Sequence, residues 1–403
     1  MYSTYLLGLP AICLAAALAM TATAEPALAA PDEPTPTPAT GWRSDLDDDG
    51  YTFRNGDLAV EIGGRMQFDV LNADSDQRDI GTRSGLRRAG VNVTTRWDDS
   101  LQLNASASFD EDGAALSGLA LTWSGVEDVR LRVGKFGSLV GMERRASGSD
   151  TLLMERGLPN ALTSRAAWGA SAGYAHAGLA AEVAWFTDWN ENDVQTRGSE
   201  GKGLAGRIAW RSDDDAAFGV HIGVSGEVRE PDGQLYRVRV RPEAELVESR
   251  LLDTALLRDV DKRTTLGAEA ALLAGPVVLQ AEYLTSELER ASGDAYLSGG
   301  YVQVGWMMTG ESRRYRGRAA AIGGVHPRGD FGAVELVARY SYLDLVDEGI
   351  RGGEGKVTSA GVNWFVTPWL RLSLDLGRAD GEPNRTGRDE KVDFVQGRLQ
   401  LAL

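Results

Sequence analysis

The residues of this chain that could do chemistry are mostly arginines. They lie on the polar side of segments in which apolar and polar residues alternate. In residues 369–379, Leu370, Leu372 and Leu374 alternate with Arg371 and Ser373. Successive side chains of a β-strand point to opposite faces, so such a segment has one apolar and one polar face. The same two-residue period places eight arginines opposite an apolar face: Arg65, Arg88, Arg96, Arg130, Arg132, Arg339, Arg371 and Arg398.

A row of arginines on a polar face can serve as a path for anions. A guanidinium group offers several N–H donors in a planar fork, which bonds carboxylate or phosphate oxygens in pairs. Rings of Arg or Lys in a pore favour anions. The same arginines could instead pair with acidic residues of the polar face, namely Glu61, Asp69, Glu335 and Asp375. Both interpretations stay open from the sequence.

These arginines require strands to position them, and sixteen alternating segments are found. No apolar run long enough for a spanning helix follows the first thirty residues. We therefore predict an all-β fold, a sixteen-stranded antiparallel transmembrane β-barrel, whose even strand number leaves an aqueous channel. The predicted strands are 57–71, 85–97, 100–109, 114–124, 128–136, 167–176, 178–189, 200–211, 215–228, 263–274, 276–287, 297–309, 331–346, 355–366, 369–379 and 391–403.

The N-terminal region divides into two parts before the barrel at 57–403. Residues 1–29 resemble a signal peptide, with an apolar stretch at 5–19 and possible cleavage sites at 22–24 and 27–29. Residues 30–56 are predicted to be a disordered Pro-rich and acidic lead-in. The one cysteine, Cys13, lies in the signal segment, so the mature chain offers no disulfide and no thiolate metal site. We expect no catalytic residues, no metal site and no cofactor.

Composition limits the function classes further. The chain has 403 residues and a net charge of −16, and its mean hydropathy is −0.24. That average is too polar for a helical membrane protein but fits a barrel, in which the lumen face and the loops dilute the lipid face. The negative total argues against nucleic acid as a partner. It says little about ion preference, because the local lining of a pore decides that.

Two connections between predicted strands are long, 137–166 and 229–262. Loops of this length in a compact barrel are usually functional. The first, which we call the inner loop, follows the fifth strand and is expected to fold inward and narrow the pore. Its constriction candidates are Arg144, Arg145, Arg156 and Arg165, which lie among Glu143, Asp150 and Glu155.

The order of short motifs resembles the phosphate-selective porin O and P family. The matching segments run through nearly the whole mature chain: 64–69 (GRMQFD), 87–91 (RRAGV), 134–136 (GKF), 149–150, 154–156 (MER), 239–243 (RVRPE), 251–254 (LLDT), 301–306 (YVQVGW), 309–311 with Tyr315, 332–333, 338–341 (ARYS), 361–364 (GVNW) and 398–401. Each motif alone is weak, but the ordered set is fairly specific.

The resemblance implies a homotrimeric barrel in the outer membrane of a Gram-negative bacterium. It would pass small inorganic anions, with phosphate and polyphosphate as the substrates of the best-known members, and its other partner would be outer-membrane lipid. By motif, Lys135 lies near the constriction loop and joins the expected ion path. The resemblance and the arginine face together predict passive diffusion of small anions through an arginine-lined lumen.

Three alternatives remain. The best-known members use a lysine cluster, whereas this acidic chain has five Lys, so a general diffusion porin with weak or cation selectivity is the main alternative. A barrel with a plugged lumen and a structural role would conduct no current. A hydrolase is suggested by the G-x-S-x-G pattern at 169–173 with His176, but that motif needs a strand-to-helix turn, and here it lies within a predicted strand. We expect no enzyme activity.

Overall fold

The structure of the protein is a computed structural model that describes residues 42–47, 50–98, 100–110, 113–187, 194–212, 218–383 and 387–403. The predicted signal peptide, 1–29, lies outside the described residues, as does the first part of the predicted lead-in. Residues 42–403 form one unit.

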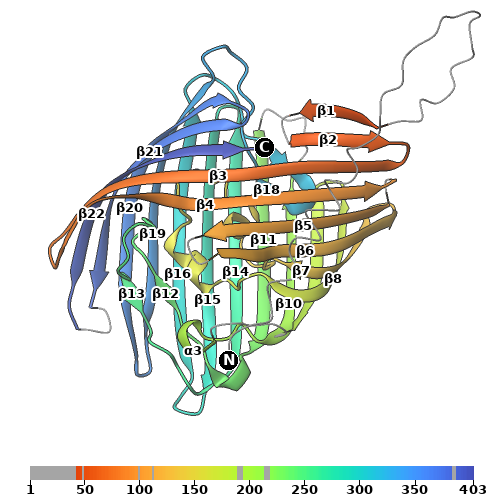
Figure 1. Ribbon diagram of the computed structural model, residues 1–403. Coiled ribbons are helices and arrows are strands. Elements are labelled where there is room, and N and C mark those ends of the chain that lie inside the picture. The colour runs from red at the N-terminus through yellow and green to blue at the C-terminus, as the bar shows by residue number, and fades with distance from the viewer. Residues whose placement is uncertain are drawn as a thin grey trace, which may run out of the picture. The chain divides into compact units, whose positions relative to one another are not determined.

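Sixteen antiparallel strands form the wall of a closed barrel (Figure 1). The last strand pairs with the first, from Ala402 opposite Arg65 to Val392 opposite Ser75. The sixteen-stranded antiparallel barrel predicted from the alternation is therefore confirmed. Its strands are β3 (Leu58–Ser75), β4 (Asp79–Trp97), β5 (Leu101–Asp110), β6 (Gly113–Val126), β7 (Val129–Phe136), β8 (Ala167–His176), β9 (Leu179–Thr187), β10 (Lys202–Arg211), β11 (Phe218–Glu230), β14 (Val260–Ala274), β15 (Val277–Arg290), β16 (Ala295–Met307), β19 (Ala333–Asp347), β20 (Ile350–Thr367), β21 (Leu370–Glu382) and β22 (Glu390–Ala402).

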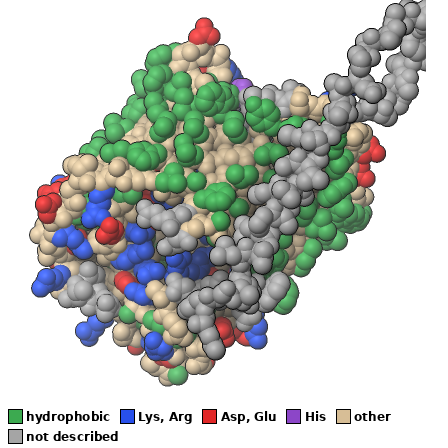
Figure 2. Space-filling view, in the orientation of Figure 1, with side chains coloured by type: hydrophobic (Ala, Val, Ile, Leu, Met, Phe, Trp, Pro, Cys, Tyr) green, Lys and Arg blue, Asp and Glu red, His purple; other side chains and the backbone are tan. Residues whose placement is uncertain are grey.

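The outer face of the barrel is apolar because alternate residues of each strand point outward. In β21, Leu374 is 51% exposed while its neighbour Ser373 is 7% exposed. Hydrophobic side chains cover much of the outer surface, and Lys and Arg gather toward the end where β12 and β13 lie (Figure 2). Closure pairs every wall strand on both sides, which satisfies the backbone groups that lipid cannot solvate.

The two ends of the barrel differ in the length of their connections. At one end, which we call the short-turn end, two-residue turns join several strand pairs. One of them is Ala177–Gly178, where Gly178 has φ 81° and a Cβ atom would lie 2.2 Å from the Arg211 carbonyl oxygen. Four exposed tryptophans lie at or near strand ends on this side of the barrel, Trp97, Trp123 and Trp210 in the last residues of β4, β6 and β10 and Trp369 in the turn between β20 and β21. This placement is typical of an interfacial aromatic girdle.

Part of the predicted disordered lead-in is ordered, which corrects the expectation for residues 43–55. Here β1 (Arg43–Asp47) pairs with β2 (Gly50–Asn55), and β2 pairs with β3 from Leu58 to Ile62. The stagger of a barrel explains this hairpin, because β22 reaches β3 only from Arg65 onward. The first residues of β3 would otherwise present an open edge, and β2 covers it.

Three long segments enter the barrel. The inner loop, 137–166, carries α2 (Met142–Arg145) and η2 (Leu158–Leu162). The 231–259 segment carries η3 (Asp232–Gln234), β12 (Arg239–Val240) and β13 (Leu252–Asp253). The 308–332 segment carries β17 (Tyr315–Arg316), η4 (Gly317–Ala319) and β18 (Ala321–Ile322), and it enters from the short-turn end. A further helix, α3 (Val194–Arg197), lies between β9 and β10.

The 308–332 segment is a long connection that the sequence analysis did not predict. Its residues pack against the inner loop, since Ile322 and Ala321 share an apolar cluster with Met142, Leu152 and Leu153. A second cluster joins the 231–259 segment to the inner wall, with Leu251 and Leu252 against side chains of β15, β16, β19 and β20. Apolar packing thus holds the inserted segments mainly against β14 to β22, with smaller contacts of Leu139 and Ala320 on β7 to β10.

The other half of the barrel wall has a partly open inner face. The inward residues of β14 to β22 are mostly buried, whereas both faces of β4, β5 and β6 are at least partly exposed. The inserted segments therefore fill the lumen beside β14 to β22 and leave space along β3 to β9. Among the described residues no helix is long and apolar enough to cross a membrane.

The lipid-facing position of Leu374 gives a test of the barrel. Replacing Leu374 by Arg should lower the free energy of unfolding by about 2–4 kcal/mol, because it places a charge in the middle of the apolar band. Leu370→Arg, beside the turn and Trp369, should cost about 0–1 kcal/mol. Urea titrations of the refolded variants in lipid vesicles, followed by tryptophan fluorescence, measure both values. An equal loss of unfolding free energy in the two variants would contradict the placement of Leu374 in the middle of the apolar band and of Leu370 at its edge.

Candidate functional site

Three neighbouring cavities follow β3 to β9, and the first of them also reaches β20 to β22. The first, of about 970 Å³, lies against β3 to β5, the second, of about 490 Å³, against β5 to β7, and the third, of about 370 Å³, against β6 to β9. Ser106 and Ser117 line both the first and the second, and Ser124, Arg130 and Arg318 line both the second and the third. The cavities therefore adjoin one another, and we call them together the passage.

The lining of the passage is strongly basic. Its five carboxylates are Glu61, Asp150, Glu127, Asp128 and Glu182. Its twelve basic side chains are Arg65, Arg87, Arg88, Arg314, Arg316 and Arg371 in the first cavity, Arg130, Arg132, Lys135 and Arg318 in the second, and Arg145 and Arg207 in the third. The charge of the passage is thus opposite to that of the chain as a whole, −16.

Arginines that line the first cavity surround one carboxylate of the inner loop, Glu155, which lies behind the lining. Arg87 Nε and Nη2 each donate to a Glu155 oxygen at 2.8 Å, and Arg88 Nη2 lies 3.9 Å from Glu155. Arg398 Nη2 also donates to Glu155, at 2.7 Å. Arg65 lies beside this group, and its buried Nε has no hydrogen-bond partner among the described residues.

Arg87 is a lining residue that the two-residue period missed. In the ladder between β3 and β4, Gln67 pairs with Arg88 and Phe68 pairs with Leu86, so Arg87 is the extra residue of a β-bulge. The bulge turns both Arg87 and Arg88 toward the lumen. The sequence carried a signal of it, because Leu86 and Ala89 both fit the outward face but are three residues apart.

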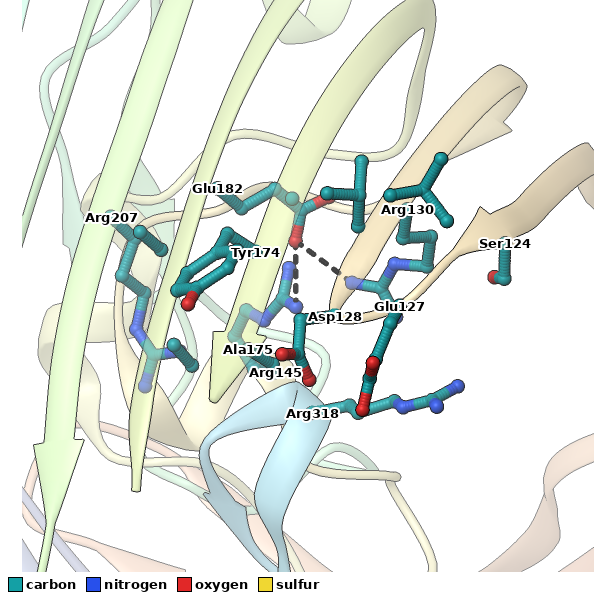
Figure 3. A pocket seen from close by; sticks show the side chains of 15 residues that line it. Ser124, Glu127, Asp128, Arg130, Arg145, Tyr174, Ala175, Glu182, Arg207 and Arg318 are labelled. Atoms are coloured by element: carbon teal, nitrogen blue, oxygen red, sulfur yellow. Dashed lines mark hydrogen bonds and ion pairs between the residues drawn. The ribbon is translucent and has the colours of Figure 1, made fainter. Parts of the chain in front are cut away.

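A second arginine cluster lies at the third cavity (Figure 3). Glu182 of β9 accepts hydrogen bonds from Arg132 at 2.5 Å, Arg145 at 3.0 Å and Arg130 at 3.3 Å. Ser171 also donates to Glu182, at 2.9 Å. One carboxylate is thus shared by three guanidinium groups, which leaves an excess of positive charge.

The 308–332 segment adds arginines to the passage that the sequence analysis did not select. Arg318 of η4 lines the second and third cavities, and Arg314 and Arg316 line the first. Arg316 forms an ion pair of 2.8 Å with Asp150 of the inner loop. The segment also provides backbone contacts for Arg207, whose Nη1 donates to the Ala319 carbonyl at 3.0 Å.

On the packed half of the barrel, wall side chains bond the backbone of the inner loop. Arg371 donates to the carbonyl oxygens of Ser149, Thr151 and Leu152 at 2.9–3.2 Å. Five other wall side chains donate to loop carbonyls: Arg398 to Met154, Arg339 to Glu155, Asn363 to Leu152, Gln67 to Gly148 and Gln400 to Ser149. Two wall carboxylates accept from loop N–H groups: Asp375 from Met154, and Glu282 from Met142 and Glu143.

Several wall arginines also pair with the carboxylates that the sequence offered as alternatives. Arg398 forms two hydrogen bonds of 2.7 Å with Asp69, and Arg96 pairs with Glu61 at 2.7 Å. Glu335 instead accepts from Arg313, and Arg339 binds Glu243 at 3.1 Å. These pairs hold Arg339 and Arg398 away from the three cavities.

The four loop arginines are separated by the fold. Arg145 lines the third cavity. Arg144 donates to Ser164 O, Arg156 to the carbonyls of Glu143 and Ala146, and Arg165 pairs with Glu200. Burial, with Arg156 nearby, lowers the pKa of Arg144 to about 10. Arg144 is therefore still charged at neutral pH, although it is used to hold the loop.

The thirteen sequence-predicted residues thus divide into two groups, and their role in ion passage stays a prediction. Seven line the passage: Arg65, Arg88, Arg130, Arg132, Lys135, Arg145 and Arg371. Six lie outside the three cavities: Arg96, Arg144, Arg156, Arg165, Arg339 and Arg398. The described residues contain no group of three or more His, Cys, Asp or Glu side chains that could hold a metal ion.

Arg371 offers a test of how the wall holds the inner loop. Replacing Arg371 by Ala removes one donor from each of three loop carbonyls. The Ser149 and Leu152 oxygens keep a second donor, in Gln400 and Asn363, so the free energy of unfolding should fall by about 1–3 kcal/mol, mainly through the Thr151 carbonyl. A loosened loop should also make the open-channel current larger and noisier. Arg378→Ala removes an exposed pair with Asp393 and should change neither quantity. Unchanged stability and current in the Arg371 variant would show that these bonds do not hold the loop.

Comparison with known proteins agrees with this architecture. A family model described as phosphate-selective porin O and P matches residues 60–403. The chain is 26% identical over 392 residues to Porin O of Pseudomonas aeruginosa, which covers 85% of this chain and 88% of that protein. It is 28% identical over 385 residues to an uncharacterized protein of Caulobacter vibrioides, covering 87% and 75% of the two chains.

Solved structures show the same fold at low sequence identity. Outer-membrane expressed OmpT of Vibrio cholerae has a TM-score of 0.56 and 13% identity, covering 87% of this chain and 99% of its own. An anion-selective porin from Comamonas acidovorans has a TM-score of 0.52 and 12% identity, covering 86% and 100%. With the family match over most of its length, this chain belongs to the phosphate-selective porin O and P family, whose members are channels of the Gram-negative outer membrane.

Proposed function

We propose that the protein lets small anions, phosphate among them, diffuse passively through the arginine-lined passage. The observation that carries the proposal is the lining of the three cavities, with twelve basic side chains against five carboxylates in a chain of net charge −16. The basic residues are thus concentrated where an ion would travel.

The distribution of the basic groups over several cavities supports passage of anions rather than tight binding of one anion. Conduction requires sites that attract an ion but release it again, which several weak sites in series do better than one deep site. Arg65 and Arg88 lie in the first cavity, Arg132 and Lys135 in the second, and Arg318 at the boundary of the second and third. An anion would move from one group to the next along the wall.

Two similar proteins add to the proposal. One relative is named Porin O, and one structural neighbour is titled an anion-selective porin. A trimer form of OmpT from Vibrio cholerae is a further neighbour, with a TM-score of 0.55. We extend this to a homotrimer for the present chain, with one passage in each subunit.

No chemical step is part of the proposed function. Ser171 of the G-x-S-x-G segment lies in β8, within a continuous strand, and its hydroxyl donates to Glu182. His176 is exposed on the turn side and bonds Asp128 at 2.7 Å. The strand-to-helix turn that a hydrolase of this motif requires is therefore replaced by a wall strand.

Ion selectivity tests the proposal directly. Refolded protein in a planar bilayer under a KCl gradient should give a reversal potential on the anion side. The double variant Arg65→Gln/Arg88→Gln should reduce the chloride-to-potassium permeability ratio about fivefold per lost charge, because each charge contributes about 1 kcal/mol of attraction in a water-filled site.

Arg378→Gln is the matched control, since it removes an exposed arginine far from the passage and should leave the ratio unchanged. A cation-selective wild type would instead favour the general diffusion porin with an acidic lining. A wild type without current would favour a plugged barrel.

A further inference from the structure

Glu155 holds an unusual position, because it is an acidic side chain in contact with two arginines that line the first cavity, Arg87 and Arg88. It accepts two hydrogen bonds from Arg87 and one from Arg398, and it lies 3.9 Å from Arg88. Its side chain is only 11% exposed. The carboxylate therefore makes with these guanidinium groups the kind of contact that a bound anion would make.

Some guanidinium groups near Glu155 donate hydrogen bonds to its carboxylate, and others do not. Arg87 directs both Nε and Nη2 to Glu155, and Arg398 divides its donors among Glu155, Asp69 and the Met154 carbonyl. Arg88 has an ion pair with Glu155 beyond hydrogen-bond distance, and Arg65 Nε has no partner among the described residues. The Nε of Arg65 is buried, but Arg65 and Arg88 both line the first cavity and donate no hydrogen bond to Glu155, so these are the two guanidinium groups that an ion in the cavity would bind.

The backbone on both sides of Glu155 is fixed, so the carboxylate cannot readily move away. Met154 N donates to Asp375 at 2.8 Å, and Arg339 donates to the Glu155 carbonyl at 2.8 Å. Burial disfavours the charged form of Glu155, but Arg87 and Arg398 outweigh it and hold the pKa of this carboxyl well below its usual range. Glu155 is therefore a permanently charged group in a fixed place.

We propose that Glu155 is a tethered counter-anion of the channel. Its carboxylate occupies arginine donors that a permeating anion would otherwise bind, and so it shortens the time that an anion stays beside Arg65 and Arg88. This inference rests on the proposed function, because it requires that anions use the passage. It makes Glu155 a residue that determines the affinity of the channel for small inorganic dianions such as hydrogen phosphate.

The same arrangement recurs at the third cavity, which supports a general design. There Glu182 is shared by Arg130, Arg132 and Arg145, as Glu155 is shared by Arg87, Arg88 and Arg398. The Glu155 cluster differs in that Asp69 also pairs with Arg398 and Glu245 with Arg87. Each carboxylate lowers the positive charge of its cluster without cancelling it. Without them, the arginines would form deep sites that slow conduction, since an ion must leave each site as well as enter it.

The test is the block of chloride current by inorganic phosphate. In Glu155→Gln the side chain keeps its size but releases the Arg87 donors and adds one net positive charge. The half-blocking phosphate concentration should fall about fivefold or more relative to wild type. Asp393→Asn removes an exposed carboxylate that pairs with Arg378 outside the passage, so phosphate should block its current at the same concentration as in the wild type.

The outcomes separate the two proposals. The wild type could be anion-selective while the half-blocking phosphate concentration of Glu155→Gln is unchanged or higher. This result would overturn the proposed role of Glu155 as a tethered counter-anion but would leave the proposed function unaffected. A wild type that is not anion-selective overturns the proposed function first.

Folding of each variant is checked by its heat-modifiable mobility on gels. If Glu155→Gln does not fold, Glu155→Asp replaces it, since it keeps the charge but withdraws it by one methylene group from Arg87. A lower half-blocking concentration in this variant supports the proposal, and a value equal to wild type counts against it.

Discussion

The backbone of the inner loop lies inside the barrel, away from bulk water, and each of its polar groups must find a partner there. Burying a peptide group without a hydrogen bond costs more than a typical bond contributes. The wall strands meet this requirement with side chains, above all Arg371 toward three loop carbonyls and Glu282 toward the first N–H groups of α2. The position of the loop, and hence the shape of the lumen, follows from these bonds.

Because those donors and acceptors lie on β14 to β22 and the adjoining β3, the loop is held to one side of the barrel. The 308–332 segment packs on the same loop through Ile322 and the Arg316–Asp150 pair. The opposite wall keeps an inner face of small polar residues, such as Ser106 and Ser117, with basic groups between them. Most of the arginines that hold the loop thus differ from those that line the space that is left, and Arg371 does both.

The distribution of charge explains why the net charge of the chain is a poor guide to its function. Acidic residues outnumber basic ones in the sequence, but many lie outside the passage, as Asp393 does in its exposed pair with Arg378. Within the barrel, Arg339 forms ion pairs with Glu143 and Glu243, and Arg313 forms one with Glu335. The electrostatic field that an ion would meet depends on the few groups that line the passage.

Much of the fold could be predicted from the sequence because a lipid-facing strand alternates apolar and polar residues over most of its length. The sixteen strands follow from that pattern, as does the inward orientation of Arg371 and Arg398. Which arginines are free could not be predicted, because pairing depends on contacts between residues far apart in the chain, such as Arg398 with Asp69. Arg87 was missed because a bulge breaks the two-residue period.

Two other elements were missed for related reasons. The β1–β2 hairpin was taken as disordered because its strand signal is weaker than its Pro-rich and acidic surroundings, and the open edge of β3 that stabilises it arises only from the stagger of the closed barrel. The predicted strands 297–309 and 331–346 left residues 310–330 between them, but nothing in the local sequence shows that this connection folds into the barrel, since its contacts with the inner loop are between residues far apart in the chain.

The most direct test of the account is cysteine accessibility along the two walls. Cys13 is the one cysteine of the sequence, so its replacement by Ser gives a background for Ser106→Cys, in the passage, and Ser373→Cys, on the packed wall. The account predicts that a negatively charged thiosulfonate modifies Ser106→Cys and reduces its current, faster than a positively charged one does, and that Ser373→Cys stays unmodified. Equal reaction at both positions, or faster reaction of the cationic reagent at Ser106→Cys, would contradict a cationic passage along one wall.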